Sequence, residues 1–544
     1  MKTSRNFSWR NIVIAAGLAA YVAVGTSSFM QKNNTFDEEY HLARGMVPLK
    51  TGDFSMNQYH PPLINVLAAL PNAFNPKVKI PADYKTHPHV GYFSWDFLWR
   101  NTEDAEKILY PGRFMMLLLG ALLAMLVYRW SRDLYGHRAG LLSFALALLS
   151  PNLMAHARLV TTDIGVTCFM FLSAYTLWRW MKKKTLKNLL IAGAALGCAQ
   201  LSKYTALVLY PLYGLLIFAD ALLDDRAERP WTSHAIDSLK GAIKPFLVLA
   251  FLSLGVTVIG YGFQPATYFQ KLFLFSKNAT EELHFYFLGQ VMNSGLWYMP
   301  LAVFAMKTPI PTLLAIVCAM FVRTDGNKKM RDHVMLFGIP VIMIAVAMIA
   351  KKNTELRYIL PVFPFLFVFS GRLIFFLKSW FRIAFIGTVI AWSAFENYTI
   401  YPHYLAYFNQ AVGGPANGHK YVVNSNLDWG QDLKGLATFM KKEGIDEIGL
   451  CYFGMGDPRY YGIDFIRLPC ASSASPYTSL IHYDEVPVSE WPPKGWIAVS
   501  AGFFTGAYLP PFLRKMFEPL KSVEPYAVIG HTIFVYRVIR AELP

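Results

Sequence analysis

Long apolar runs separated by short polar segments fill the first 400 residues of the chain. Most runs approach the roughly 20 residues that a helix needs to cross the hydrocarbon core of a bilayer. The pattern therefore predicts a polytopic α-helical membrane protein with about eleven spans. The runs lie at 11–29, 112–130, 139–155, 163–180, 187–202, 204–222, 243–262, 295–321, 333–350, 357–377 and 383–400.

The charged loops between the runs predict how the spans are oriented. Cytoplasmic loops carry an excess of lysine and arginine, and here the basic clusters recur on every second loop, on the same side as the N-terminus. We therefore expect a cytoplasmic N-terminus. The basic clusters lie at 129–138, 179–187, 226–244, 323–331 and 372–382.

The other segments are expected to face outward, which makes the first of them a long outer loop at 30–111. Within it, the apolar segment 63–71 follows two prolines and predicts a short helix that lies along the membrane surface. The first apolar run resembles a signal peptide, but no small-residue cleavage site stands out, so we expect it to remain as the first helix. The remaining outward segments are 156–163, 201–204, 263–294, 351–357 and everything after residue 400.

The character of the chain changes after residue 400. Alternating and helical patterns there predict a small extracytoplasmic α/β domain at 401–544, following a membrane domain at 1–400 that includes the loop 30–111. A helix is expected at 433–442, ending at Gly444. Strands are expected at 421–423, 448–453, 496–499 and 532–538.

Composition narrows the class of protein. The chain is 54% hydrophobic and carries a net charge of +16. The basic residues stand in short clusters between apolar runs, so loops that fix topology explain the charge better than a nucleic-acid partner. Of the five cysteines, only Cys451 and Cys470 lie in the polar C-terminal part, where a disulfide is an open alternative.

A cluster of ionisable residues follows the first apolar run by only a few residues. It contains Asp37, Glu38, Glu39 and His41. Ionisable groups near hydrocarbon cost roughly 2.5–3.5 kcal/mol each at a helix centre, so such a cluster marks a functional site by default. On a helix, the i,i+4 spacing would place Asp37 and His41 on one face.

Several cations break the topology rule because they stand in short outward-facing segments. Each alone could reach lipid headgroups, but a partly buried cation needs an anion. Asp163 opens an apolar run on the same side, either as a helix-start residue or as a second acid of a cavity. Together with Asp37 and Glu38, the set predicts a charged outer cavity that holds a phosphate or pyrophosphate. The cations are Arg158, Lys203, Lys351, Lys352 and Arg357.

A divalent metal is an alternative use of the same acidic cluster. Glu38, His41 and His60 are of the types that ligate metals, as is Asp37. No fixed ligand spacing accompanies them, so we expect that no cofactor is required.

An ordered series of motifs resembles the lipid-carrier-dependent GT-C glycosyltransferases. These include the protein O-mannosyltransferases and the bacterial aminoarabinose transferases that modify lipid A. The resemblance covers about 10–365, and the segments Tyr404–Asn409 and Asn424–Asp432 resemble the C-terminal domain of a bacterial branch of the family. The motifs are Phe36–Glu38, His60–Leu63, Tyr110–Arg113, Arg158–Asp163, Leu201–Tyr204, Lys307–Pro311 and Arg357–Pro361.

The resemblance implies a membrane glycosyltransferase. Such an enzyme takes a sugar from a polyprenyl-phosphate donor and inverts the anomeric carbon as it transfers the sugar to an acceptor hydroxyl at the outer face. Asp37 would be the general base, Glu38 would position Asp37 or the acceptor, and Asp163 would be a second acid. The donor phosphate would be held by Lys203, Arg357, Arg158, His60 and Arg113.

The same resemblance implies the surroundings of the enzyme. The protein would lie in a bacterial inner membrane with its C-terminal domain in the periplasm. Its partners would be the lipid-linked donor, membrane lipid, and an acceptor that is a protein, a lipid or a glycan. His60 stands where the lipid A enzymes carry a lysine, so its expected contribution is a hydrogen bond rather than a charge.

Two other functions fit part of the pattern. A transporter or flippase of a lipid-linked anionic substrate would also be polytopic, but transporters usually show internal repeats and broken helices near mid-membrane, and neither is visible in the sequence. A metal-dependent enzyme similar to oligosaccharyltransferases would use the acidic cluster as ligands.

Overall fold

Helices dominate the computed structural model. It describes residues 9–56, 60–86, 90–224, 231–278, 285–322, 330–350, 355–376, 379–470, 495–509 and 511–539. The helices before residue 261 are α1 (Trp9–Met30), α2 (Glu38–Thr51), α3 (Leu63–Ala73), α4 (Val90–Trp99), α5 (Ala105–Tyr135), α6 (His137–Leu148), α7 (Pro151–Ala157), α8 (Thr162–Lys182), α9 (Leu186–Ser202), α10 (Leu209–Asp224) and α11 (Trp231–Gly260).

The second half of the helical part begins after α11. It contains α12 (Pro265–Asn278), the hairpin β1 (Phe285–Phe287) and β2 (Gln290–Met292), α13 (Met299–Lys307), α14 (Ile310–Met320), α15 (Met330–Ala350), α16 (Phe363–Ser370) and α17 (Ser379–Ile400). Short 3-10 turns join several of these elements: η1 (Tyr204–Val208), η2 (Leu356–Tyr358), η3 (Leu360–Val362) and η4 (Gly371–Phe375).

The described helices support a multipass membrane protein. Four of them are long and apolar enough to cross a membrane, or up to six segments if each of two bent helix pairs is one span. The pair α6 and α7 bends by 62° and the pair α13 and α14 by 111°. The run 295–321, predicted as one span, is therefore broken, because Pro309 and Pro311 have no N–H to continue the helix. The count of eleven spans stays a prediction.

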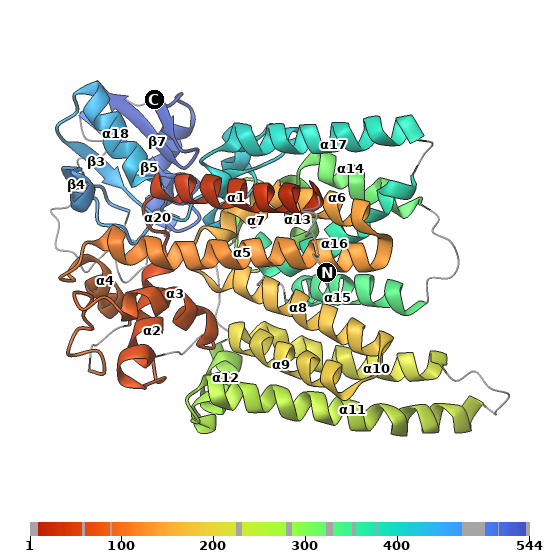
Figure 1. Ribbon diagram of the computed structural model, residues 1–544. Helices are drawn as coiled ribbons and strands as arrows, with labels where there is room; N and C mark the ends of the chain where they lie inside the picture. Colours follow the sequence, from red (N-terminus) through yellow and green to blue (C-terminus); the bar gives the residue numbers. More distant parts are fainter. Residues whose placement is uncertain are drawn as a thin grey trace, which may run out of the picture.

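The elements of the outer loop and the C-terminal sheet lie at the same end of the helical bundle (Figure 1). The predicted surface helix at 63–71 is α3, and two further helices, α2 and α4, accompany it. This arrangement is the one expected if both segments face the same side of a membrane. Which side that is stays a prediction.

The C-terminal part contains a mixed five-stranded sheet in the order β4-β3-β5-β7-β6. β3 runs parallel to β4 and β5, while β7 is antiparallel to β5 and β6. The elements are α18 (Leu433–Glu443), β3 (Ile448–Cys451), β4 (Phe465–Arg467), β5 (Gly495–Ser500), α19 (Ala501–Phe504), α20 (Pro511–Lys521), β6 (Ala527–Ile529) and β7 (Ile533–Val538).

Most predicted elements of this part are present, but one is wrong. α18 ends at Gly444, whose φ of 64° is the left-handed conformation that glycine adopts most readily. The expected strand at 421–423 is instead a link between the 3-10 turns η7 (Pro415–Lys420) and η8 (Asn424–Asn426). The backbone N–H of Tyr421 bonds to Gly418, and its carbonyl bonds to Leu288 of the β1–β2 hairpin, so no neighbouring strand is paired.

Part of the sheet has its own core, formed by Leu433, Leu436, Ile448, Ala498 and Val535 among others. Other strand residues, including Ile497, Val499 and Phe534, belong to the large core of the helical part. Leu405, Phe408, Leu427 and Trp429 belong to the large core of the helical part. The division of the chain at residue 400 stays a prediction, and the segment 404–429 is packed with the helices.

Candidate active site

Asp37 stands at the junction between the outer loop and the helical bundle. It is the N-cap residue of α2, with φ of −98° and ψ of −12°. Its carboxylate is 30% exposed and accepts a hydrogen bond of 3.1 Å from Nη1 of Arg357. The backbone N–H of the preceding Phe36 donates to the carbonyl of Trp429 at 3.0 Å. Asp37 is therefore held from two distant segments while its side chain stays accessible.

Arg357 lies in η2 and is the centre of a charged group. Its Nε donates to Oε2 of Glu355 at 2.5 Å, and its guanidinium carbon lies 4.6 Å from the ring centre of Trp429 and 5.2 Å from that of Tyr358. Glu355 also accepts a bond of 2.6 Å from Asn424. Guanidinium groups stack well on aromatic faces, so the plane of Arg357 is fixed by rings as well as by carboxylates.

Lys203 and Asp163 form a second buried ion pair. Lys203 follows α9 in an extended conformation, and its Nζ donates to Oδ1 of Asp163 at 2.8 Å. Asp163, in the first turn of α8, is 1% exposed. The Nζ atom lies 5.1 Å from the ring centre of Tyr358. Tyr358 thus contacts both cations, and the predicted residues Asp37, Asp163, Lys203 and Arg357 come together.

Lys203, Arg357 and Tyr358 line one small pocket. Its other walls are largely apolar and come from α8, η1, α15 and η3: Val166, Thr205, Val208, Met343, Val346, Ala347 and Pro361. Val346 is 44% exposed, so the apolar wall continues onto the outside of α15. The pocket is small, with a volume of about 30 Å³.

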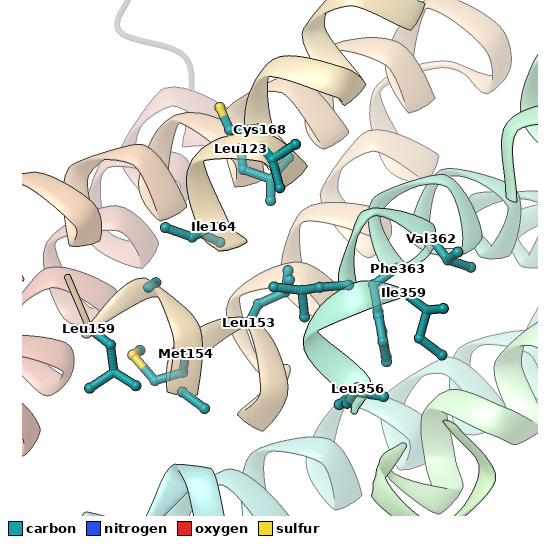
Figure 2. Packing of buried hydrophobic residues seen from close by; sticks show 14 of the residues in the cluster. Leu123, Leu153, Met154, Leu159, Ile164, Cys168, Leu356, Ile359, Val362 and Phe363 are labelled. Atoms are coloured by element: carbon teal, nitrogen blue, oxygen red, sulfur yellow. The ribbon is translucent and has the colours of Figure 1, made fainter. Parts of the chain in front are cut away.

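Apolar packing holds the two charged segments against one another. Leu153, Leu159 and Ile164 come from the chain around Arg158 and Asp163, and Leu356 and Phe363 come from the chain around Arg357. Figure 2 shows these residues in a single buried cluster. The core therefore fixes the spacing of the charged groups that line the pocket.

Glu38 and Arg113 pair with each other in the interior of the protein. Both side chains are fully buried and form a two-bond ion pair, with distances of 2.9 and 2.5 Å. The other three N–H groups of Arg113 donate to backbone carbonyls of Phe29, Lys32 and Asn33. All five donors are used, so Arg113 has none left for a donor phosphate. The expectation that it binds phosphate is corrected.

The Glu38 carboxylate is equally occupied. It accepts from the backbone N–H groups of Val160 and Thr35, each at 2.8 Å. Burial opposes its ionisation, but the Arg113 guanidinium and these N–H groups hold the pKa of Glu38 below its usual value. Glu38 fixes the loop that ends at Asp37, which agrees with a positioning role and not with a metal ligand.

The neighbouring Glu39 lies in a different electrostatic environment from Glu38. It is fully buried and accepts a bond of 2.5 Å from Asn34. Burial raises the pKa of its carboxyl well above the usual range, so Glu39 is protonated more readily than Glu38.

Two predicted histidines lie beside the site as neutral groups. The rings of His41 and His60 are 5.4 Å apart, and Nδ1 of His41 bonds to Asn65 at 2.8 Å. Burial lowers the pKa of both. Nδ1 of His60 is buried without a hydrogen-bond partner in the described ranges. Among the residues that the structure describes, no three His, Cys, Asp or Glu side chains form a metal-binding group.

Arg158 is buried away from the pocket lining. It is 1% exposed and lies 5.9 Å from the ring centre of Tyr404. Its Nε and Nη1 have no hydrogen-bond partner within the described part of the chain. It is not among the residues that line the pocket, so its predicted phosphate contact stays untested. Lys351 and Lys352 lie outside the described residues.

The lysine of the Lys307–Pro311 motif joins the helical part to the chain after α17. Its Nζ donates to the carbonyl of Leu405 at 2.9 Å and to that of Asn426, and it lies 4.5 Å from the ring centre of Phe408. It is 2% exposed. The lysine of this motif therefore connects two segments through hydrogen bonds and does not line the pocket.

Local sequence patterns predict no role for Glu355, Asn424 or Trp429. The available signal is the dense run of polar residues around a tryptophan at 424–432. The chain also resembles a bacterial branch of the family there, but no spacing links that run to Arg357. Contacts between segments about 70 residues apart cannot be deduced from local pattern alone.

The middle of the chain matches a known family. The sequence profile of the dolichyl-phosphate-mannose-protein mannosyltransferases matches residues 105–252, from α5 into α11. This match confirms the resemblance to GT-C glycosyltransferases that the motifs predict. No curated protein sequence matches the chain.

Three solved structures are similar to the whole or part of the chain. ArnT from Cupriavidus metallidurans in the apo state is 14% identical, over 97% of this chain and 98% of that chain, with a TM-score of 0.48. The apo oligosaccharyltransferase of Archaeoglobus fulgidus is 12% identical, over 95% and 73%, with a TM-score of 0.46. The S. cerevisiae Pmt1-Pmt2 complex bound to the sugar donor is 16% identical, over 53% and 39%, with a TM-score of 0.31. Similarities this distant do not extend to individual residues.

The buried pair predicts a large effect on stability. Glu38→Gln leaves the Arg113 charge buried without its counter-ion, which costs about 3–5 kcal/mol in comparable pairs. We expect a clear drop in the thermal unfolding midpoint of the protein in detergent. The matched control is Glu518→Gln, which breaks the exposed pair with Lys521 at 2.7 Å and should cost below about 1 kcal/mol. Equal shifts for the two variants would contradict a supporting role for Glu38.

Proposed function

We propose that the protein is a membrane glycosyltransferase. It moves a sugar from a polyprenyl-phosphate donor to an acceptor hydroxyl at the outer face, with inversion at the anomeric carbon. The observation that carries the proposal is the contact between the accessible Asp37 carboxylate and Arg357, which shares a pocket with Lys203. A base and a pair of cations within one site suit transfer from a glycosyl phosphate.

In the proposed step, Asp37 accepts the proton of the acceptor hydroxyl as its oxygen bonds to the anomeric carbon. A hydroxyl is a weak acid, so the proton must leave as the bond forms, with the base within about 2.6–3.2 Å. The bond from the anomeric carbon to the phosphate oxygen breaks at the same time. The products are the glycosylated acceptor and the polyprenyl phosphate.

Lys203 and Arg357 would stabilise the negative charge that grows on the leaving phosphate. Pre-oriented cations in a partly buried site are more effective than solvated ones, because little reorganisation is needed. In the resting state they pair with Asp163 and Glu355. The donor phosphate would compete with these carboxylates for the two cations.

The apolar walls of the pocket support a lipid-linked donor. They include Val166 of α8 and Met343, Val346 and Ala347 of α15, and they lead from the cations toward the exposed face of α15. A prenyl chain that leaves along this wall would keep its phosphate beside Lys203 while its tail stays in hydrocarbon. A water-soluble nucleotide sugar has no use for such a wall.

A transporter or flippase of a lipid-linked anion is the second candidate. Bent helix pairs are common in transporters, and the pairs α6–α7 and α13–α14 are of that kind. Lys203 and Arg357 do not stand on these pairs, however. Release of free sugar-acceptor product in detergent, without a membrane to cross, would favour the enzyme.

Asp37→Asn should abolish transfer while donor binding persists. Removal of a general base typically costs about 100- to 10,000-fold in rate. The measurement is sugar transfer from a polyprenyl-phosphate sugar by purified protein, with thermal unfolding to check the fold. Asp53→Asn, in the same outer loop and 20% exposed, is the control and should keep normal activity. Full activity of Asp37→Asn would rule out the proposed base.

Lys203→Ala and Arg357→Ala should mainly weaken donor binding. A hydrogen bond to a charged group contributes roughly 1.5–3 kcal/mol, so each change should raise the Kd for a polyprenyl phosphate by about 10- to 100-fold. Binding to protein in detergent measures this directly. Lys50→Ala removes an exposed lysine whose contact is the carbonyl of Ala73, and should leave the Kd unchanged. Unaltered affinity in both pocket variants would eliminate the phosphate clamp.

A further inference from the structure

The segment Asn424–Trp429, between α17 and the C-terminal sheet, contacts every residue of the stretch that presents Arg357. Asn424 donates to Glu355 at 2.6 Å, Oδ1 of Asn426 accepts from the backbone N–H of Leu356 at 3.0 Å, and Trp429 faces Arg357 at 4.6 Å. Glu355, Leu356 and the pocket residue Arg357 are thus each contacted by a side chain from one segment.

The same segment also reaches the proposed base. The carbonyl of Trp429 accepts the N–H of Phe36, next to Asp37, at 3.0 Å. Phe36 further stacks on Phe453, with ring centres 5.6 Å apart and planes at 11°, and Phe453 stacks on Tyr508 at 4.6 Å and 7°. Arg357 and Phe36, the residue before Asp37, therefore both contact the chain after residue 400.

The segment is largely buried and is hydrogen-bonded to other elements. Trp429 is 2% exposed and Asn426 is 3% exposed. The carbonyl of Asn426 also accepts a hydrogen bond from the buried Lys307. Asn424 has φ of 62°, a conformation that asparagine tolerates better than most residues. These contacts tie the segment to α13 as well as to η2.

We propose that Trp429 and Asn424 are positioning residues of the active site. Trp429 would orient the guanidinium of Arg357 through its ring, and Asn424 would fix Glu355, which holds the other edge of Arg357. The segment after α17 would thereby complete a phosphate site whose charged groups all come from the helical part. This inference rests on the proposed function, because it assigns Arg357 to the donor phosphate.

The first test uses the ring of Trp429. Trp429→Ala should weaken binding of a polyprenyl phosphate by about 10-fold, in the range expected for loss of a desolvated cation–π contact, and should lower transfer. Trp429→Phe keeps an aromatic face and should restore most of both. The matched control is Trp496→Ala on β5, whose ring lies 5.4 Å from Arg537 within the sheet and should not affect donor binding.

A double-variant measurement separates positioning from general support. If Trp429 acts through Arg357, then Trp429→Ala should add no further loss of donor affinity in an Arg357→Ala background. Asn424→Gly, which suits the positive φ but removes the amide, should weaken donor binding less than Trp429→Ala does.

The outcomes are distinct for the two proposals. A wild-type protein that neither binds polyprenyl phosphate nor transfers sugar would overturn the proposed function itself. A wild-type protein that binds the donor, with Trp429→Ala binding it equally well, would overturn only the positioning role. So would a loss that is the same size with and without Arg357, or a Trp429→Phe variant as impaired as Trp429→Ala at unchanged thermal stability.

Discussion

The buried ion pair between Glu38 and Arg113 is the constraint on which the site depends. It joins the end of α1, the loop before α2, the helix α5 and the turn at Val160 in one network without exposed atoms. Such a pair is costly to bury and very costly to break, because the remaining charge has no partner. The pair positions two segments of the site. One is the loop that ends at Asp37, and the other is the turn that leads to Asp163.

Each cation that lines the pocket is paired with a carboxylate. Lys203 rests on Asp163, and Arg357 rests on Glu355 and Asp37. In surroundings of low polarity, an unpaired cation would be destabilising, so the resting carboxylates stabilise the empty site. In the proposed function, a donor phosphate would displace these carboxylates, and Asp37 would then be free to face the acceptor. The same charged side chains would thus pair with one another in the empty site and contact the substrates in the proposed reaction.

Much of this arrangement could be predicted from the sequence, since cations in loops that are predicted to face outward violate a strong topological rule. That violation identified Lys203 and Arg357, and their partners Asp37 and Asp163 were the acids expected on the same side. Arg113 was assigned to phosphate because a sequence does not reveal which carboxylate a buried arginine meets. The strand expected at 421–423 was wrong because β-branched residues there serve a turn that is fixed by tertiary hydrogen bonds. The role of Trp429 was missed because its partner, Arg357, lies 72 residues earlier in the chain. A local sequence pattern cannot predict a contact over that separation.

The central claim is that a lipid phosphate binds between Lys203 and Arg357 with Asp37 beside it. A cryo-electron microscopy structure of the protein with a bound polyprenyl phosphate tests this most directly. The account predicts phosphate oxygens within about 3.2 Å of Lys203 Nζ and the Arg357 guanidinium, with the prenyl chain along α15. Density for the phosphate at any other place, with both cations still paired to Asp163 and Glu355, would contradict it.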